Sequence, residues 1–160
     1  MEFKIDNHQE EYLNSINFME NRVNEIIKGL SNDLIWFVNY PSIYTFGPQT
    51  IESDLKIKDL FPVYETSRGG KLTYHGPGQR TVYLMIDLNK RTKDIKKFVR
   101  KIELVILKTL SFYNIEGELN NDHHGVFVQK NMRAHKIASI GLKFKKWTSF
   151  HGFSINVRTQ

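Results

Sequence analysis

The 160-residue sequence contains no cysteine. These residues therefore cannot form a disulfide, a thiolate metal site or a cysteine nucleophile, and the composition agrees with a reducing compartment. Long apolar runs are also missing, since none approaches the roughly 18 residues that span a membrane. The opening segment, MEFKIDNHQEEY, lacks the apolar core of a signal peptide. We expect one cytoplasmic domain over residues 1–160, with no membrane association.

Acidic residues are absent after Asp122. Seven basic residues follow that position: Lys130, Arg133, Lys136, Lys143, Lys145, Lys146 and Arg158. The net charge of +6 is thus the sum of −1 over residues 1–122 and +7 beyond them. A positive surface attracts any polyanion, so an acidic protein, a nucleic acid and an anionic membrane all fit this charge, as does an ordinary solvated surface.

Two segments have apolar residues at the three- and four-residue spacing of a helix that faces a core, residues 7–29 and 91–113. Gly29 is expected to end the first helix, and Thr92 or Asp94 to cap the second.

Shorter apolar or alternating runs predict strands, bounded by turn-forming residues. They cover residues 34–38, 44–46, 62–66, 81–86, 125–128, 136–144 and 147–157. The last two are expected to form a hairpin through Lys145 and Lys146. Helices and strands in this order predict an α+β fold, with a mixed sheet packed by helices.

The segment from Arg68 to Gln79, RGGKLTYHGPGQ, holds four of the ten glycines of the chain. Glycine allows backbone to approach a ligand closely, so this segment is a candidate pocket wall; the alternative is a glycine-rich turn. It matches neither the Walker phosphate loop nor the dinucleotide-binding fingerprint.

Six histidines are spread along the chain without the spacing of a metal site, so we expect surface imidazoles and no metal. Lys136 begins a strand-like run, KIASIG, whose apolar neighbours could lower the pKa of its amine or let it act as a fixed charge beside an acyl or carboxyl group; the alternative is a solvated lysine at a strand start.

Several of these motifs together resemble the octanoyltransferases, also called lipoate-protein ligase B. They are RGGxxTYHGPGQ at 68–79, Tyr83, Asp87-Leu88, KIASIG at 136–141, FHGF at 150–153 and Asn156. Weaker similarity lies at PSIYTFG, residues 41–47, and at His124-Gly-Val. The resemblance implies the catalytic-domain fold of biotin and lipoate protein ligases, here without its last elements.

The resemblance also implies an activity: transfer of an octanoyl group from acyl carrier protein to a lysine of a lipoyl domain. The acceptors would be lipoyl domains of 2-oxoacid dehydrogenases or the glycine cleavage H protein, and no cofactor is expected. Lys136 would lower the pKa of a nucleophilic cysteine. The implied acyl-pocket residues are Arg68, Gly69, Gly70, Lys71, Leu72, Thr73, Tyr74, His75, Ser139, Ile140, Gly141, Gly152, Phe153 and Ser154.

The family's cysteine lies in a Pro-Cys-Gly setting that this sequence does not contain. We therefore expect a C-terminally incomplete domain, an uncovered edge on the strand at 147–157, and doubtful acyltransferase activity. The main alternative is an inactive module that binds acyl groups or lipoyl domains. An ATP-dependent ligase and a nucleic-acid-binding protein are further alternatives, although Phe144, Trp147, Phe150 and Phe153 fit a strand core better than base stacking.

Overall fold

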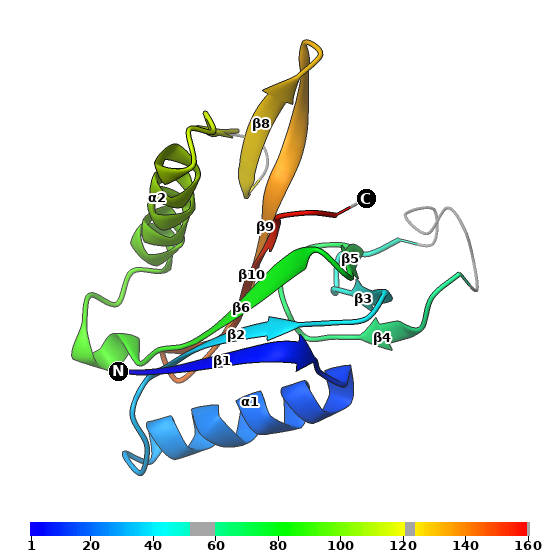
Figure 1. Ribbon diagram of the computed structural model, residues 1–160. Helices are drawn as coiled ribbons and strands as arrows, with labels where there is room; N and C mark the ends of the chain where they lie inside the picture. The colour runs from blue at the N-terminus through cyan, green and yellow to red at the C-terminus, as the bar shows by residue number, and fades with distance from the viewer. Residues whose placement is uncertain (52–59, 121–123, 160) are drawn as a thin grey trace.

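The computed structural model describes residues 1–51, 60–120 and 124–159. A seven-stranded sheet has the order β1-β2-β6-β10-β9-β8-β7, and a three-stranded sheet has the order β4-β3-β5 (Figure 1). The strands are β1 (Glu2–Gln9), β2 (Leu34–Asn39), β3 (Ile43–Phe46), β4 (Val63–Glu65), β5 (Thr73–His75), β6 (Gln79–Met85), β7 (Glu118–Leu119), β8 (Val126–Lys130), β9 (Arg133–Lys145) and β10 (Thr148–Asn156). The helices are α1 (Tyr12–Ile27) and α2 (Ile95–Phe112), with a 3₁₀ turn at Leu88–Lys90. The expected α+β fold with a mixed sheet is confirmed.

The large sheet separates two apolar cores, because successive side chains of a strand point to opposite faces. On β6, Tyr83 and Met85 pack with α1, whereas Val82 and Leu84 pack with α2. We call these the α1 face and the α2 face. The helices α1 and α2 therefore cover opposite faces of one sheet, and β2, β6 and β10 contribute side chains to both cores.

The C-terminal end of α1 and the N-terminal end of α2 lie where the sequence predicted them. Gly29 has a φ of +74°. The amide of Leu30 donates to the carbonyl of Glu25, and that of Gly29 to Ile26. This pattern is a Schellman motif, which satisfies the last carbonyls of α1. At α2, the Asp94 side chain accepts a hydrogen bond from the Lys97 amide at 2.9 Å, so of the two expected caps Asp94 is the one used.

Three strands were not predicted. β5 and β7 are only three and two residues long. β1 pairs in parallel with β2, and its Phe3 and Ile5 are exposed. Its pattern is inverted relative to a half-buried strand, because the polar Lys4 and Asp6 lie over Trp36. The first helix accordingly begins at Tyr12 and not at residue 7.

The strand β10 is interior to the sheet, which corrects the expectation of an uncovered edge at 147–157. It pairs with β6 on one side and β9 on the other, both antiparallel. The hairpin of β9 and β10 is confirmed, and its turn lies at Lys146 and Trp147, which have φ values of 48° and 65°. None of the described helices is long and apolar enough to cross a membrane.

The small sheet holds the glycine-rich segment against the large one. β3 pairs with both β4 and β5, so the loop at 66–72 returns over β9. There the Gly69 amide donates to the Leu142 carbonyl at 3.1 Å. A Cβ at Gly47 would lie 2.1 Å from the Gly70 carbonyl oxygen, and one at Gly141 would lie 2.8 Å from that of Gly69. Glycine at these positions allows the two sheets to meet.

Candidate functional site

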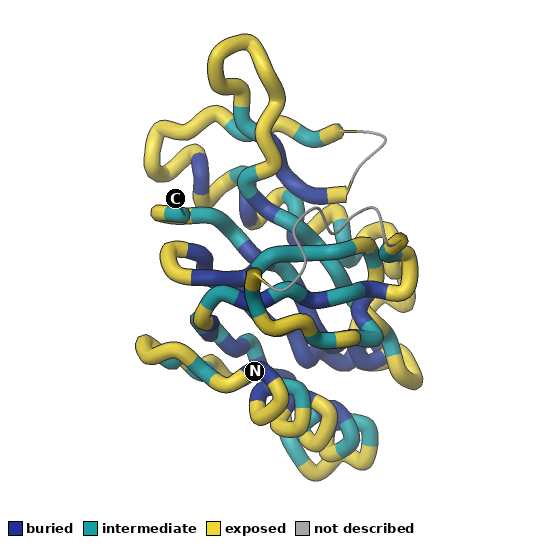
Figure 2. The backbone as a smooth tube through the Cα atoms, turned by 90° about the vertical axis from the view of Figure 1, so that its right-hand side faces the viewer, coloured by how far each residue is buried: buried dark blue, intermediate teal, exposed yellow. Residues whose placement is uncertain are grey.

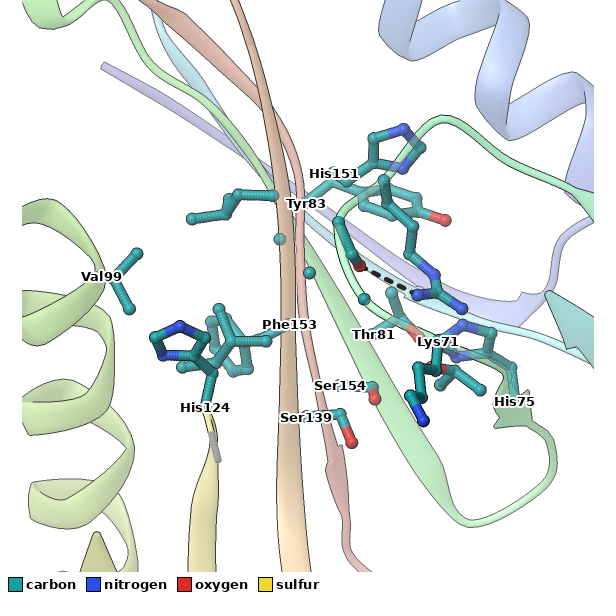
Figure 3. A pocket seen from close by; sticks show the side chains of 18 of the residues that line it. Lys71, His75, Thr81, Tyr83, Val99, His124, Ser139, His151, Phe153 and Ser154 are labelled. Carbon is teal, nitrogen blue, oxygen red and sulfur yellow. Dashed lines mark hydrogen bonds between the residues drawn. The ribbon is translucent and has the colours of Figure 1, made fainter. Parts of the chain in front are cut away.

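A cavity of about 700 Å³ lies where the glycine-rich loop meets β6, β9 and β10 (Figure 3). Residues of both sheet faces line it. Figure 3 shows Val99, His124 and Phe153 on the side of α2, and His75, Thr81, Tyr83 and His151 on the other side of β9 and β10. We call the second part the glycine side, because the loop at 68–73 forms its wall.

Arg68 is the fixed charge of the glycine side. Its guanidinium is buried and donates to the Thr45 carbonyl at 2.7 Å, to the Thr45 hydroxyl at 2.8 Å and to the Gly69 carbonyl at 3.1 Å. Among the described residues, no carboxylate forms an ion pair with it. Burial lowers the pKa of Arg68, but an arginine stays charged in proteins. Among the described groups, only dipoles stabilise this buried cation.

His75 is held in one orientation by a chain of hydrogen bonds. The Gln79 amide nitrogen donates to the Tyr74 carbonyl and to the Asn156 side-chain oxygen, so the Gln79 side-chain oxygen faces His75. That oxygen lies 2.7 Å from His75 Nδ1 and can only accept, so Nδ1 carries the proton. Nε2 is then an acceptor. Burial, together with the Arg68 charge, lowers the pKa of His75 to about 4, so the ring is neutral.

His151 and Tyr83 lie beside one another, with ring centroids 6.2 Å apart. His151 is 3% exposed, and within the described part of the chain neither of its ring nitrogens has a hydrogen-bond partner. Burial lowers its pKa to about 3, and the charges of Arg68 and Lys143 add to this effect. Burial likewise raises the pKa of Tyr83, whose hydroxyl lies 2.9 Å from that of Tyr40. His75, His151 and Tyr83 are therefore uncharged, and Arg68 is the charged member of this set of buried side chains.

Three hydroxyl side chains form a row across neighbouring strands. Ser139 on β9 is registered with Ser154 on β10, and Ser154 with Thr81 on β6. All three line the cavity. The Thr81 hydroxyl lies 3.3 Å from His75 Nδ1, whereas those of Ser139 and Ser154 bond to no described residue. The row therefore offers free donors to a polar group in the cavity.

Lys136 reaches the same side through an irregularity in β9. Val126 pairs with Ala138, but Phe127 pairs with Lys136, so Ile137 is an extra residue. Such a bulge reverses the alternation of side chains, which places Lys136 on the face of Ser139. Its amine donates to the His124 carbonyl at 3.1 Å and lies 5.2 Å from the centre of the Phe127 ring. Partial burial lowers the pKa of Lys136.

The structure brings most of the expected acyl-pocket residues to one cavity. Its lining includes Arg68, Gly69, Gly70, Lys71, Leu72, Thr73, His75, Lys136, Ser139, Ile140, Gly141, Gly152, Phe153 and Ser154. Tyr74 does not line it. The Tyr74 hydroxyl lies 3.0 Å from that of Ser42, and its ring packs against Tyr44 and Phe61 on the far side of the small sheet.

Ile140 and Phe153 also differ from the other expected residues, because they face α2. They pack with the core of the α2 face, whereas Ser139, Gly141 and Ser154 face α1. The cavity thus has an apolar part near α2, formed by these two side chains with Ile95, Val99 and Leu142. It has a second, more polar part on the glycine side.

The expectation of surface imidazoles is wrong for His75 and His151, which are buried, and holds for His8, His124 and His135. His123 lies outside the described residues. In residues 1–51, 60–120 and 124–159, no three His, Asp or Glu side chains are close enough to share a metal ion. Thr81 and Leu142 line the cavity and were not predicted as site residues. The only feature of the sequence that could have indicated them is their position next to the motifs at 68–79 and 136–141.

The chain matches the family model described as lipoyl protein ligase A/B catalytic domain, over residues 11–160. The chain belongs to this family. Among curated relatives of this lipoyl ligase family, the octanoyltransferase of Bartonella bacilliformis is 42% identical over 168 residues, which cover 99% of this chain and 70% of the relative. The octanoyltransferase of Anaplasma phagocytophilum is 40% identical over 160 residues, covering 99% and 77%. The resemblance to octanoyltransferases is confirmed, and these relatives are acyltransferases by name.

Solved structures show the same fold at low identity. Plasmodium falciparum LipL1 in complex with lipoate superposes with a TM-score of 0.70 at 18% identity, over 99% of this chain and 48% of that one. The bipartite lipoate protein ligase of Thermoplasma acidophilum gives 0.69 at 15% identity, over 100% and 63%. The chain thus spans about half of the first protein and less than two thirds of the second. At these identities the likeness concerns the lipoyl ligase fold.

Proposed function

We propose that this chain forms the acyl-binding part of an octanoyltransferase, which moves an octanoyl group from acyl carrier protein to a lysine of a lipoyl domain. In this reaction the thioester C–S bond breaks and an amide C–N bond forms. The lysine amine loses one proton and the carrier thiol gains one. The observation that carries the proposal is the 40–42% identity to octanoyltransferases over nearly the whole chain. The lipoyl domains of 2-oxoacid dehydrogenases or the glycine cleavage H protein are the proposed acceptors, and the cytoplasm is the proposed location.

The glycine side supports a role in holding the thioester end. Gly69, Gly70 and Gly141 line a wall without side chains, where backbone amides can approach an acyl group. The free hydroxyls of Ser139 and Ser154 lie on the same face as the Lys136 amine and can donate to a carbonyl oxygen. The Lys136 amine there would position the thioester, and partial burial, which lowers its pKa, favours the loss of its proton.

The absence of cysteine from these 160 residues limits what the chain does by itself. An acyl-cysteine intermediate cannot form on it, so the cavity would bind the octanoyl thioester and any transfer would rely on proximity. This favours, as the second candidate, a binding module for acyl groups or lipoyl domains.

Intact-mass analysis of a lipoyl domain mixed with octanoyl carrier protein and this chain separates the two candidates. Octanoyl addition to the lysine at a rate proportional to the concentration of the chain supports transfer. Saturable binding of octanoyl-pantetheine without any mass gain supports the module. The site itself is tested by Ser154→Leu, which fills the glycine side and should abolish octanoyl-pantetheine binding. The matched change Val105→Trp, on the exposed surface of α2 outside the cavity lining, should leave it intact; an equal loss in both variants would contradict the proposed site.

A further inference from the structure

The hairpin of β8 and β9 projects from the body of the protein (Figures 1 and 2). Every residue from 129 to 135 is exposed. We define the hairpin tip as Lys130, Asn131, Met132 and Arg133. Lys130 pairs with Arg133 across a two-residue turn, in which Asn131 and Met132 have φ values of 52° and 58°. The tip is therefore a tight turn with a fixed geometry, held away from the core.

Met132 is an unusual residue for this turn. Turns with two positive φ values favour Asn followed by Gly, and the second position here is a methionine that is 100% exposed. The turn holds a large apolar side chain in solvent, in a backbone conformation that glycine would adopt more easily. Methionine adapts its shape to a partner surface and is enriched with arginine in protein interfaces.

The charged side chains around Met132 have no partner among the described residues. Neither the Lys130 amine nor the Arg133 guanidinium takes part there in a hydrogen bond or ion pair, whereas the Lys145 amine, near the far end of β9, donates to Asn24. Gln129, the residue before the tip, donates a hydrogen bond to the Glu118 carboxylate. The free guanidinium of Arg133 can bind a carboxylate through two parallel hydrogen bonds.

We propose that the hairpin tip is the docking surface for the acidic carrier protein that delivers the octanoyl thioester; this rests on the proposed function. Met132 contacts an apolar patch between acidic side chains, and Lys130 and Arg133 bind the surrounding carboxylates. Charge complementarity of this kind steers association and selects the partner.

The position of the hairpin tip relative to the cavity favours a carrier over an acceptor. Lys136 lines the cavity four residues along β9 from Met132, which is about 13 Å at the rise of a strand. A carrier protein docked at the tip spans this distance with its long pantetheine arm. A lipoyl domain offers an amine on a four-carbon stem, so its body must come much closer to the thioester.

The test compares dissociation constants for octanoyl carrier protein by titration calorimetry at low and high salt. The double variant Lys130→Glu/Arg133→Glu should weaken binding by about tenfold or more. The matched variant Lys101→Glu/Lys108→Glu, on the exposed surface of α2, changes the net charge equally and should change binding by less than about twofold. Higher salt should weaken carrier binding by the parent chain, so that its dissociation constant approaches that of the hairpin variant.

Met132→Gly separates docking from folding. Glycine relieves the left-handed backbone, so the melting temperature should stay equal or rise, while carrier binding should weaken by about threefold or more. Binding of octanoyl-pantetheine, which has no protein surface, should be unchanged in all variants.

Three results would overturn the proposal. Unchanged carrier binding in the hairpin variants, with normal octanoyl-pantetheine binding by the parent chain, removes the docking surface and leaves the proposed function standing. If the parent chain binds no octanoyl-pantetheine, the proposed function fails and the docking proposal with it. If the hairpin variants weaken binding of a lipoyl domain and not of the carrier, the surface belongs to the acceptor.

Discussion

Acid should destabilise this protein well before its carboxylates titrate, because His75 and His151 are buried as neutral rings. The pKa of His75 is lowered to about 4 and that of His151 to about 3, chiefly by burial. In the unfolded chain both return to about 6.5. A base whose folded pKa is lowered contributes stability above its unfolded pKa. That stability is lost as the pH falls below 6.5 and the unfolded chain takes up protons.

The magnitude follows from this proton linkage. At pH 5, protonation stabilises the unfolded state by about 2 kcal/mol per imidazole, while both rings of the folded state stay neutral. The two histidines together should lower the free energy of unfolding by about 4 kcal/mol between pH 7 and pH 5, a large part of the roughly 5–15 kcal/mol of a typical domain. Asp6 and Glu2, whose pKa values are lowered, lose their contribution only in more acidic solution.

Urea unfolding at the two pH values measures this loss, with the slope of the transition as a check that the unfolded state is unchanged. The variant His75→Asn/His151→Asn should remove most of the pH dependence. Asparagine places its amide nitrogen near Nδ1 and tolerates the positive φ of 58° at His151. The exposed His135→Asn should have no effect. A loss below about 1 kcal/mol in the parent chain, or an equal loss in the double variant, would refute the argument.

Four further substitutions test the site and the fold around it. Arg68→Met should destabilise the fold by about 3 kcal/mol through lost charged hydrogen bonds. It should also raise the pKa values of the buried imidazoles in NMR titration; unchanged pKa values would show that the cation does not act on them. Gly152→Ala would place a Cβ 2.0 Å from the Val82 carbonyl oxygen and should cost at least about 2 kcal/mol in chemical denaturation. Asp94→Ala should cost about 1 kcal/mol by thermal unfolding, and Thr92→Ala close to nothing; equal losses would mean that the cap is shared.

Local physics explains which parts of the fold could be predicted. The 3.6-residue periodicity indicated both helices, and Gly29 and Asp94 marked ends that depend only on neighbouring backbone. β1 escaped prediction because its apolar side chains face solvent, and its pairing with β2 joins residues about thirty apart in the chain. Such non-local pairing leaves no periodic signal in the sequence.

The composition and the local motifs already define which chemical groups are available: no thiol, a glycine-rich segment that starts at Arg68, and basic residues without acidic ones after Asp122. The arrangement of these groups in space depends on the folded chain. The fold buries His75 and His151, two imidazoles that the sequence suggested were exposed. It also buries Arg68 without an ion pair to any carboxylate of the described residues. The physical reason is clearest at Lys136, where a single bulge in the pairing of β8 with β9 moves the amine to the face of Ser139. Side-chain direction in a strand depends on register with its neighbour, and that register is set by contacts between distant parts of the chain.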